Sequence, residues 1–195
     1  MSPELKIGNP MNIILIGYRC TGKTLTGRHL AARLGFPFYD TDEMIARQTG
    51  RTVEAIVAEK GWPAFREAER AVIMGLSQTN RSVISLGGGA VFETDNVDHL
   101  KRSGLFVWLT ADAWTIAGRM ANDPISGTQR PSLTGRAGIE DIKEILAERE
   151  PLYRRLAALT VDTTTGGIED VAEAICTGLR KMFPQAEEII GKKEK

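Results

Sequence analysis

Short apolar runs recur along the chain and alternate with longer segments in which apolar residues repeat at helical spacing. Each run is apolar on both faces of the strand that it would form, which is typical of strands buried between two layers of helices. This alternation predicts an α/β fold with a five-stranded parallel sheet covered by helices on both sides. The predicted strands are residues 12–16, 37–39, 82–86, 105–109 and 159–162.

Helix start and stop signals flank several of the segments with helical spacing. Thr52 stands before "VEAIVAEK" as a helix N-cap, and Pro63 suits the first turn of the next helix. Gly35, Gly61 and Gly104 stand where helices should end. The predicted helices are residues 23–34, 42–49, 53–60, 63–78, 95–102, 112–121, 139–157 and 168–182.

The length of 195 residues, with 42% hydrophobic residues, is sufficient for one domain with a sizeable core. We assign this domain to residues 11–182, between an N-terminal extension of residues 1–10 and a charged C-terminal tail of residues 183–195. Between about 122 and 138 the helical pattern gives way to "NDPISGTQRPSLTGRAG". A loop this long in a compact domain is often a functional lid, although an ordinary surface loop would explain it equally well.

Charge and cysteine content argue against several classes of partner. Lys plus Arg and Asp plus Glu both number 25, so neither a nucleic-acid surface nor a membrane surface is indicated. The two cysteines, Cys20 and Cys176, lack the spacing of a zinc site or of a disulfide scaffold. The first ten residues lack the apolar core of a signal peptide, and no run approaches the roughly 18 apolar residues of a membrane span. We therefore expect a cytoplasmic protein with reduced thiols.

The segment "GYRCTGKT", residues 17–24, follows the first predicted strand and fits the pattern G-x-x-x-x-G-K-[ST]. Its glycines allow backbone N–H groups to surround phosphate oxygens, and the following helix offers its positive end. In such a loop Lys23 reaches the β- and γ-phosphates, and the Thr24 hydroxyl can ligate Mg²⁺. An ordinary Gly-rich turn is the alternative, but the strand and helix around the loop favour nucleotide binding. The candidate nucleotide-binding residues here are Gly17, Arg19, Cys20, Thr21, Gly22, Lys23, Thr24 and Leu25.

Asp40 and Asp42 stand at the carboxyl end of the second predicted strand, the edge of an open α/β sheet at which ligands bind. Two carboxylates separated by one residue can have different functions. One can face the water shell of a metal ion while the other faces a substrate hydroxyl that attacks phosphorus. Asp42 would also serve as the N-cap of the next helix, which is the alternative without catalytic function.

In "AFREAER", Arg66 and Glu69 are three residues apart on one face of a predicted helix. The carboxylate could orient the guanidinium group there. A solvent-exposed ion pair is the usual alternative for such a spacing.

Three consecutive glycines, Gly87, Gly88 and Gly89, come directly after the third predicted strand in "VISLGGGAV". A tight turn needs one or two glycines, whereas a longer run allows close approach of the backbone to a ligand. Arg130 in "QRPSLTG" and Arg149 in "AEREPLYRR" carry a planar guanidinium that suits phosphate or carboxylate recognition. Because most arginines are simply exposed, each of these two is weak evidence by itself.

Taken together, "GYRCTGKT", "YDTD", "FREAE", "GGG", "RPSL" and "EREPLY", in this order and spacing, resemble the shikimate kinase family of P-loop kinases. The resemblance runs from about residue 11 to residue 182, and its motifs beyond the Gly-rich loop are together specific to this family. It implies a P-loop NTPase fold like that of the nucleoside monophosphate kinases, a three-layer α/β/α sandwich with a mobile lid. The substrate-binding region would then be about residues 41–80.

The family transfers the γ-phosphate of ATP to the 3-hydroxyl of shikimate with Mg²⁺, in the route to aromatic amino acids. The resemblance implies ATP and Mg²⁺ as cofactors, shikimate as the small-molecule substrate, and a monomer. It implies that Arg66 and Arg149 bind the shikimate carboxylate, and that Arg119 lies over the adenine. The implied catalytic residues are Lys23, Asp42 and Arg130, and the implied metal-binding residues are Thr24 and Asp40. The implied shikimate-binding residues are Asp42, Arg66, Gly87, Gly88, Gly89 and Arg149. The resemblance also adds Arg119 and Arg130 to the nucleotide-binding residues of the loop.

Three positions depart from the family pattern. Leu86 precedes the glycines where the family often has Thr, and Gly61 and Trp62 stand where many members have Gly-Glu. The segment "DTTTGG" lacks an arginine that some members carry. We interpret these departures as variation in supporting residues, with activity retained.

Two other functions stay open at this point. Another small-molecule kinase of the same fold, such as a gluconate-type kinase, would need different substrate residues in place of Arg66 and Arg149. A nucleotide-binding regulatory module without turnover is the alternative from a different class, against which the intact Lys23, Asp42 and Arg130 argue.

Overall fold

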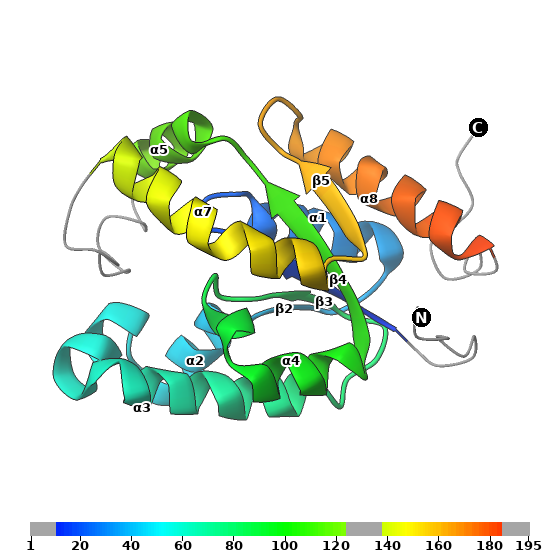
Figure 1. Ribbon diagram of the computed structural model, residues 1–195. Helices are drawn as coiled ribbons and strands as arrows, with labels where there is room; N and C mark the ends of the chain where they lie inside the picture. The colour runs from blue at the N-terminus through cyan, green and yellow to red at the C-terminus, as the bar shows by residue number, and fades with distance from the viewer. Residues whose placement is uncertain (1–10, 124–137, 185–195) are drawn as a thin grey trace.

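The computed structural model describes residues 11–123 and 138–184. Its centre is a five-stranded sheet in the order β2-β3-β1-β4-β5, in which every neighbouring pair of strands is parallel (Figure 1). The predicted strands are confirmed, because each end agrees with the structure within one residue. The strands are β1 (Asn12–Ile16), β2 (Phe38–Asp40), β3 (Val83–Ser85), β4 (Gly104–Thr110) and β5 (Leu159–Asp162).

Successive residues of the central strand β1 point to opposite faces of the sheet, and both faces are buried. Ile14 and Ile16 pack in a cluster with residues of α3 (Val53–Leu76) and α4 (Thr94–Lys101). Ile13 and Leu15 pack in a second cluster with residues of α1 (Lys23–Leu34) and α8 (Ile168–Met182). The continuous apolar pattern of the strand is therefore explained by burial on both sides.

The helices other than α1 and α8 form two groups in Figure 1. Figure 1 shows α2 (Thr41–Thr49), α3 and α4 together at the bottom of the view, and α5 (Ala113–Asn122) and α7 (Ile139–Leu156) together toward the top. A third apolar cluster joins Tyr18, which follows β1, to Ile116 of α5 and Ile142 of α7. The phosphate-loop region is thus packed against the helix that carries Arg149. The 3-10 helix η1 (Ala90–Phe92) directly follows the three glycines.

The predicted helix ends agree with the structure within two residues. The predicted helices 53–60 and 63–78 form one continuous run as α3, but Gly61, with φ 77° and ψ 172°, breaks the helical geometry between them. The predicted cap is confirmed, since the Thr52 hydroxyl oxygen accepts a hydrogen bond from the N–H of Ala55 at 3.2 Å.

Because β1, β2 and β3 are adjacent and parallel, their carboxyl ends meet at one edge of the sheet. The phosphate loop, Asp40 and Gly87 come at or directly after these three ends. The predicted lid at about 122–138 falls almost wholly outside the described residues, and Arg130 lies there too. In the described part of the chain, no helix is both long enough and apolar enough to span a membrane.

Candidate active site

The loop between β1 and α1 has a backbone that depends on glycine. Gly17 has φ 139° and Gly22 has φ 87°, values that residues with a Cβ rarely adopt. The Nζ atom of the largely buried Lys23 donates hydrogen bonds to the carbonyl oxygens of Gly17, at 2.9 Å, and Tyr18, at 2.7 Å. The loop therefore curls around an ammonium group at the N-terminus of α1, which is an arrangement suited to an anion.

Asp40 connects the phosphate loop to the start of α2. Its Oδ2 accepts a hydrogen bond from the Thr24 hydroxyl at 2.8 Å, and its Oδ1 accepts from the N–H groups of Asp42 and Glu43 at 3.1 and 3.3 Å. Asp40 is thus the N-cap of α2, and the alternative in which Asp42 is the cap is wrong. The extended backbone of Asp40 brings its side chain back over the first turn, so Asp40 and not Asp42 caps the helix.

A cavity of about 880 Å³ opens beside the phosphate loop, a size suited to a nucleotide. Residues 20–25 line one part of it, and Arg119 of α5 and Thr163 line another. Arg119 Nη1 donates to Thr163 Oγ1 at 3.0 Å and to the carbonyl oxygen of Cys20 at 3.3 Å. Arg119 therefore ties α5 to the phosphate loop at the wall of this cavity.

A second, smaller cavity is lined by cationic and aromatic side chains, among them Arg19, Trp62, Phe65, Arg66 and Arg149. Asp42, Gly87 and Gly88 line both cavities. Asp42 therefore lies where the two cavities meet. A group held in the smaller cavity and a phosphate held by the loop would both be near it.

The buried carboxyl group of Glu69 pairs with Arg66 at the wall of the smaller cavity. Its Oε2 accepts a hydrogen bond from Arg66 Nη1 at 2.5 Å, and Glu69 is only 1% exposed, so the alternative of a solvent-exposed pair is wrong. Glu69 Oε1 has no hydrogen-bond partner in the part of the chain that the structure describes. Burial raises the pKa of Glu69 from 4.5 to about 7, and this effect outweighs the opposite effect of the Arg66 charge.

Side-chain ends approach the first and third of the consecutive glycines closely. A Cβ on Gly87 would lie 2.9 Å from Asp42 Oδ1, and a Cβ on Gly89 would collide with the guanidinium of Arg66. Neither glycine has a positive φ, so the reason is close approach rather than backbone conformation. The glycines therefore let the carboxylate and the guanidinium lie directly against the chain that follows β3.

Two side chains that the sequence did not single out position this glycine segment. The Thr41 hydroxyl oxygen accepts a hydrogen bond from the N–H of Gly87 at 2.9 Å, and the Tyr153 hydroxyl donates to the carbonyl oxygen of Gly88 at 2.5 Å. Burial raises the pKa of Tyr153 to about 12, so its hydroxyl keeps the proton that it donates. Both residues belong to motifs quoted above, but nothing in a Thr or a Tyr indicated these contacts.

The structure separates Arg19 from the other candidates in the phosphate loop. Its side chain lines the smaller cavity with Arg66 and Arg149, whereas residues 20–25 line the larger one. Leu25 lines the larger cavity but is 59% exposed, so its side chain lies mostly in solvent.

Comparison with known proteins places this site in a family. Residues 19–180 match the family model described as shikimate kinase. A shikimate kinase of Syntrophus aciditrophicus is 45% identical over 172 residues, which cover 84% of this chain and 88% of that protein. The chain belongs to the shikimate kinase family. Shikimate kinase 2 of Sodalis glossinidius is 39% identical over 175 residues, which cover 90% of this chain and 97% of that protein.

Solved structures agree with the family and with the predicted fold. A shikimate kinase from Acinetobacter baumannii in complex with shikimate superposes with a TM-score of 0.81 at 33% identity, covering 91% of this chain and 95% of that one. A gluconokinase from Sinorhizobium meliloti superposes with a TM-score of 0.56 at 18% identity. This second likeness shows a shared fold alone. The predicted P-loop kinase architecture is therefore confirmed.

Proposed function

We propose that this protein transfers the γ-phosphate of ATP to the 3-hydroxyl of shikimate, giving shikimate 3-phosphate and ADP. The observation that supports this most directly is the position of Asp42, which lines both cavities. The phosphate loop lines one cavity and a group of arginines lines the other. A phosphate donor and an anionic acceptor can therefore meet at Asp42. Membership of the shikimate kinase family supports the same reaction.

The smaller cavity suits a hydroxylated acid. Arg66 and Arg149 would bind the carboxylate through the N–H groups of their planar guanidinium groups. Asp42 would accept a hydrogen bond from the 3-hydroxyl and take its proton as the oxygen attacks phosphorus. The apolar walls that Trp62 and Phe65 provide would exclude water from the reacting groups.

Lys23 would stabilise the negative charge that develops on the transferred phosphoryl group, because its ammonium is already held at the phosphate loop. Arg130, which lies outside the described residues, is proposed to act on the same charge from the lid. Cys20, Thr21 and Gly22 would hold the phosphates from the loop, with Arg119 lining the same cavity beside Cys20.

The residues around Thr24 and Asp40 fit Mg²⁺ bound mainly through phosphates and water. Among the described residues, no group of three or more His, Cys, Asp or Glu side chains converges as a metal site. Mg²⁺ commonly keeps several waters and takes few protein ligands beside substrate phosphates. The Thr24 hydroxyl and the Asp40 carboxylate, 2.8 Å apart, would supply such ligands. When bound, the ion supplies charge neutralisation at the phosphates.

We further propose that the protein works as a monomer in the cytoplasm. Cys20 lies in the phosphate loop and Cys176 is buried in α8, and the two form no disulfide with each other. This arrangement is compatible with a reducing compartment.

The test of the proposed function is a coupled assay of ADP formation with shikimate, with gluconate, or with neither added. Shikimate should raise ADP formation well above the rate without an acceptor, and gluconate should not, because the chain belongs to the shikimate kinase family and shares only its fold with the gluconokinase. A larger rate with gluconate would favour the gluconate-type kinase. Equal rates in all three mixtures would favour a binding module without turnover.

A further inference from the structure

The guanidinium group of Arg149 lies over two aromatic rings from different parts of the chain. Its Cζ atom is 5.7 Å from the centroid of the Tyr18 ring, in the phosphate loop, and 5.4 Å from the centroid of the Phe92 ring, at the end of η1. Both distances fall within the roughly 6 Å over which a cation is attracted to an aromatic face. Arg149 itself comes from α7, so three elements meet at this one charge.

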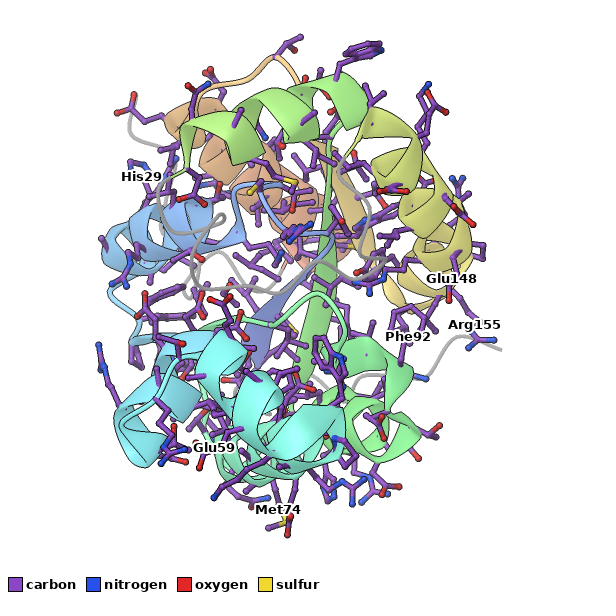
Figure 2. The ribbon with its side chains drawn as sticks, turned by 90° about the vertical axis from the view of Figure 1, so that its left-hand side faces the viewer. His29, Glu59, Met74, Phe92, Glu148 and Arg155 are labelled. Carbon is purple, nitrogen blue, oxygen red and sulfur yellow. The ribbon has the colours of Figure 1, made fainter. Side chains whose placement is uncertain are left out.

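Phe92 has little structural reason to be aromatic. The residue is 43% exposed, and the buried clusters of the described residues do not include it. Figure 2 labels Phe92 beside α7, the helix that carries Arg149. Unlike Arg149, Phe92 is not among the described residues that line the smaller cavity. The contact with Arg149 is therefore the link between this ring and the cavity.

The two arginines assigned to the substrate carboxylate are held in different ways. Arg66 is oriented by Glu69, a carboxylate that occupies one of its N–H groups. In the described part of the chain, no carboxylate lies within ion-pair distance of Arg149. Aromatic rings attract a guanidinium by their faces and accept none of its in-plane N–H groups. The Tyr153 hydroxyl also interacts with Arg149, but this group is neutral. The remaining N–H groups therefore meet no carboxylate of the described residues.

We infer that Phe92 is a positioning residue for the substrate carboxylate, because its ring restricts the Arg149 guanidinium to the orientation in which the N–H groups face the smaller cavity. The ring lowers the conformational entropy that Arg149 loses when substrate binds, and it does so without adding a negative charge next to an anion. This inference rests on the proposed function, in which Arg149 binds the carboxylate of shikimate.

The test compares Phe92→Leu, which removes the ring but keeps an apolar side chain, with Phe92→Tyr, which keeps a ring. Phe92→Leu should raise the KM for shikimate roughly two- to fivefold, the effect expected for loss of one partly exposed cation–π contact. Its kcat and its KM for ATP should stay within about 1.5-fold of the unaltered protein, and Phe92→Tyr should keep the original KM. Met74→Leu is the matched control, because Met74 is an exposed apolar residue of α3, labelled in Figure 2, that lines neither cavity.

A double-mutant cycle decides whether Phe92 acts through Arg149. In an Arg149→Ala background, Phe92→Leu should add no further increase in the KM for shikimate. The inference is overturned if Phe92→Leu keeps the original KM, if Phe92→Tyr is as impaired as Phe92→Leu, or if the increase persists without Arg149. If the unaltered protein shows no shikimate-dependent turnover, the proposed function fails, and the inference fails with it. That result can be told apart from the three outcomes above, each of which leaves the shikimate-dependent turnover intact.

Discussion

Glu69 should make the stability of this protein depend on pH near neutrality. Its pKa is about 7 in the folded protein against 4.5 as the reference value, because burial disfavours the charged carboxylate more than the nearby Arg66 charge favours it. Between these two pH values the folded chain binds more protons than the unfolded chain. The free energy of unfolding should therefore fall as pH rises from about 4.5 to about 7 and then level off.

The size of this effect follows from the two pKa values. At about 1.4 kcal/mol for each pH unit, the contribution of Glu69 that is present below pH 4.5 and lost above pH 7 is about 3 kcal/mol. Glu69→Gln keeps the shape and an acceptor for Arg66 but cannot ionise. The free energy of unfolding of Glu69→Gln should therefore lack this part of the pH dependence.

The assay is urea unfolding of the unaltered protein and of Glu69→Gln at several pH values between about 5 and 8. Glu67→Gln is the matched control, because Glu67 lies on the same helix and is exposed, so it should keep the pH dependence of the unaltered protein. Parallel curves for the unaltered protein and Glu69→Gln would show that Glu69 titrates as an ordinary surface carboxyl. The account of how Arg66 is held would then be wrong.

Three further predictions concern activity. Lys23→Ala should lower kcat roughly 10²-fold or more, as loss of a positioned charge does, and a kcat within twofold of the original would refute its role. Arg149→Ala should raise the KM for shikimate more than it lowers kcat, because the carboxylate keeps its charge during the reaction; a change confined to the KM for ATP would place Arg149 in the wrong cavity. Gly89→Ala should also raise the KM for shikimate, since the new Cβ displaces the Arg66 guanidinium, whereas Gly75→Ala, which meets no atom within 4 Å, should not; equal effects of the two would contradict the argument from space.

The sequence predicted the fold and the approximate place of the site because both follow from local patterns. The apolar run before residues 17–24 identified β1 and the phosphate loop, and parallel strands bring their carboxyl ends to one edge. Asp42 and Gly87 therefore had to lie near the loop, as the shared lining of the two cavities shows. Helix ends were predicted within two residues because caps such as Thr52 are local as well.

What the sequence could not supply are contacts between positions far apart whose residue types are ordinary. The Tyr153 hydroxyl on the carbonyl of Gly88, 65 positions away, depends on how α7 crosses the glycine segment. The choice of Asp40 over Asp42 as the cap depends on one backbone conformation, φ −113° and ψ 124°, that both aspartates could have adopted. Cys20 has φ 60°, a left-handed conformation that its residue type does not indicate.

The transfer of labelled phosphate tests the central claim most directly. The protein would be mixed with Mg²⁺, shikimate and ATP labelled at the γ-phosphate, and the label would be followed in ATP, in free phosphate and in a phosphate ester of shikimate. The account predicts that the label appears in the shikimate ester in proportion to the ADP formed, with little free phosphate. Label that stays in ATP, or that appears as free phosphate at the same rate with and without shikimate, would contradict it.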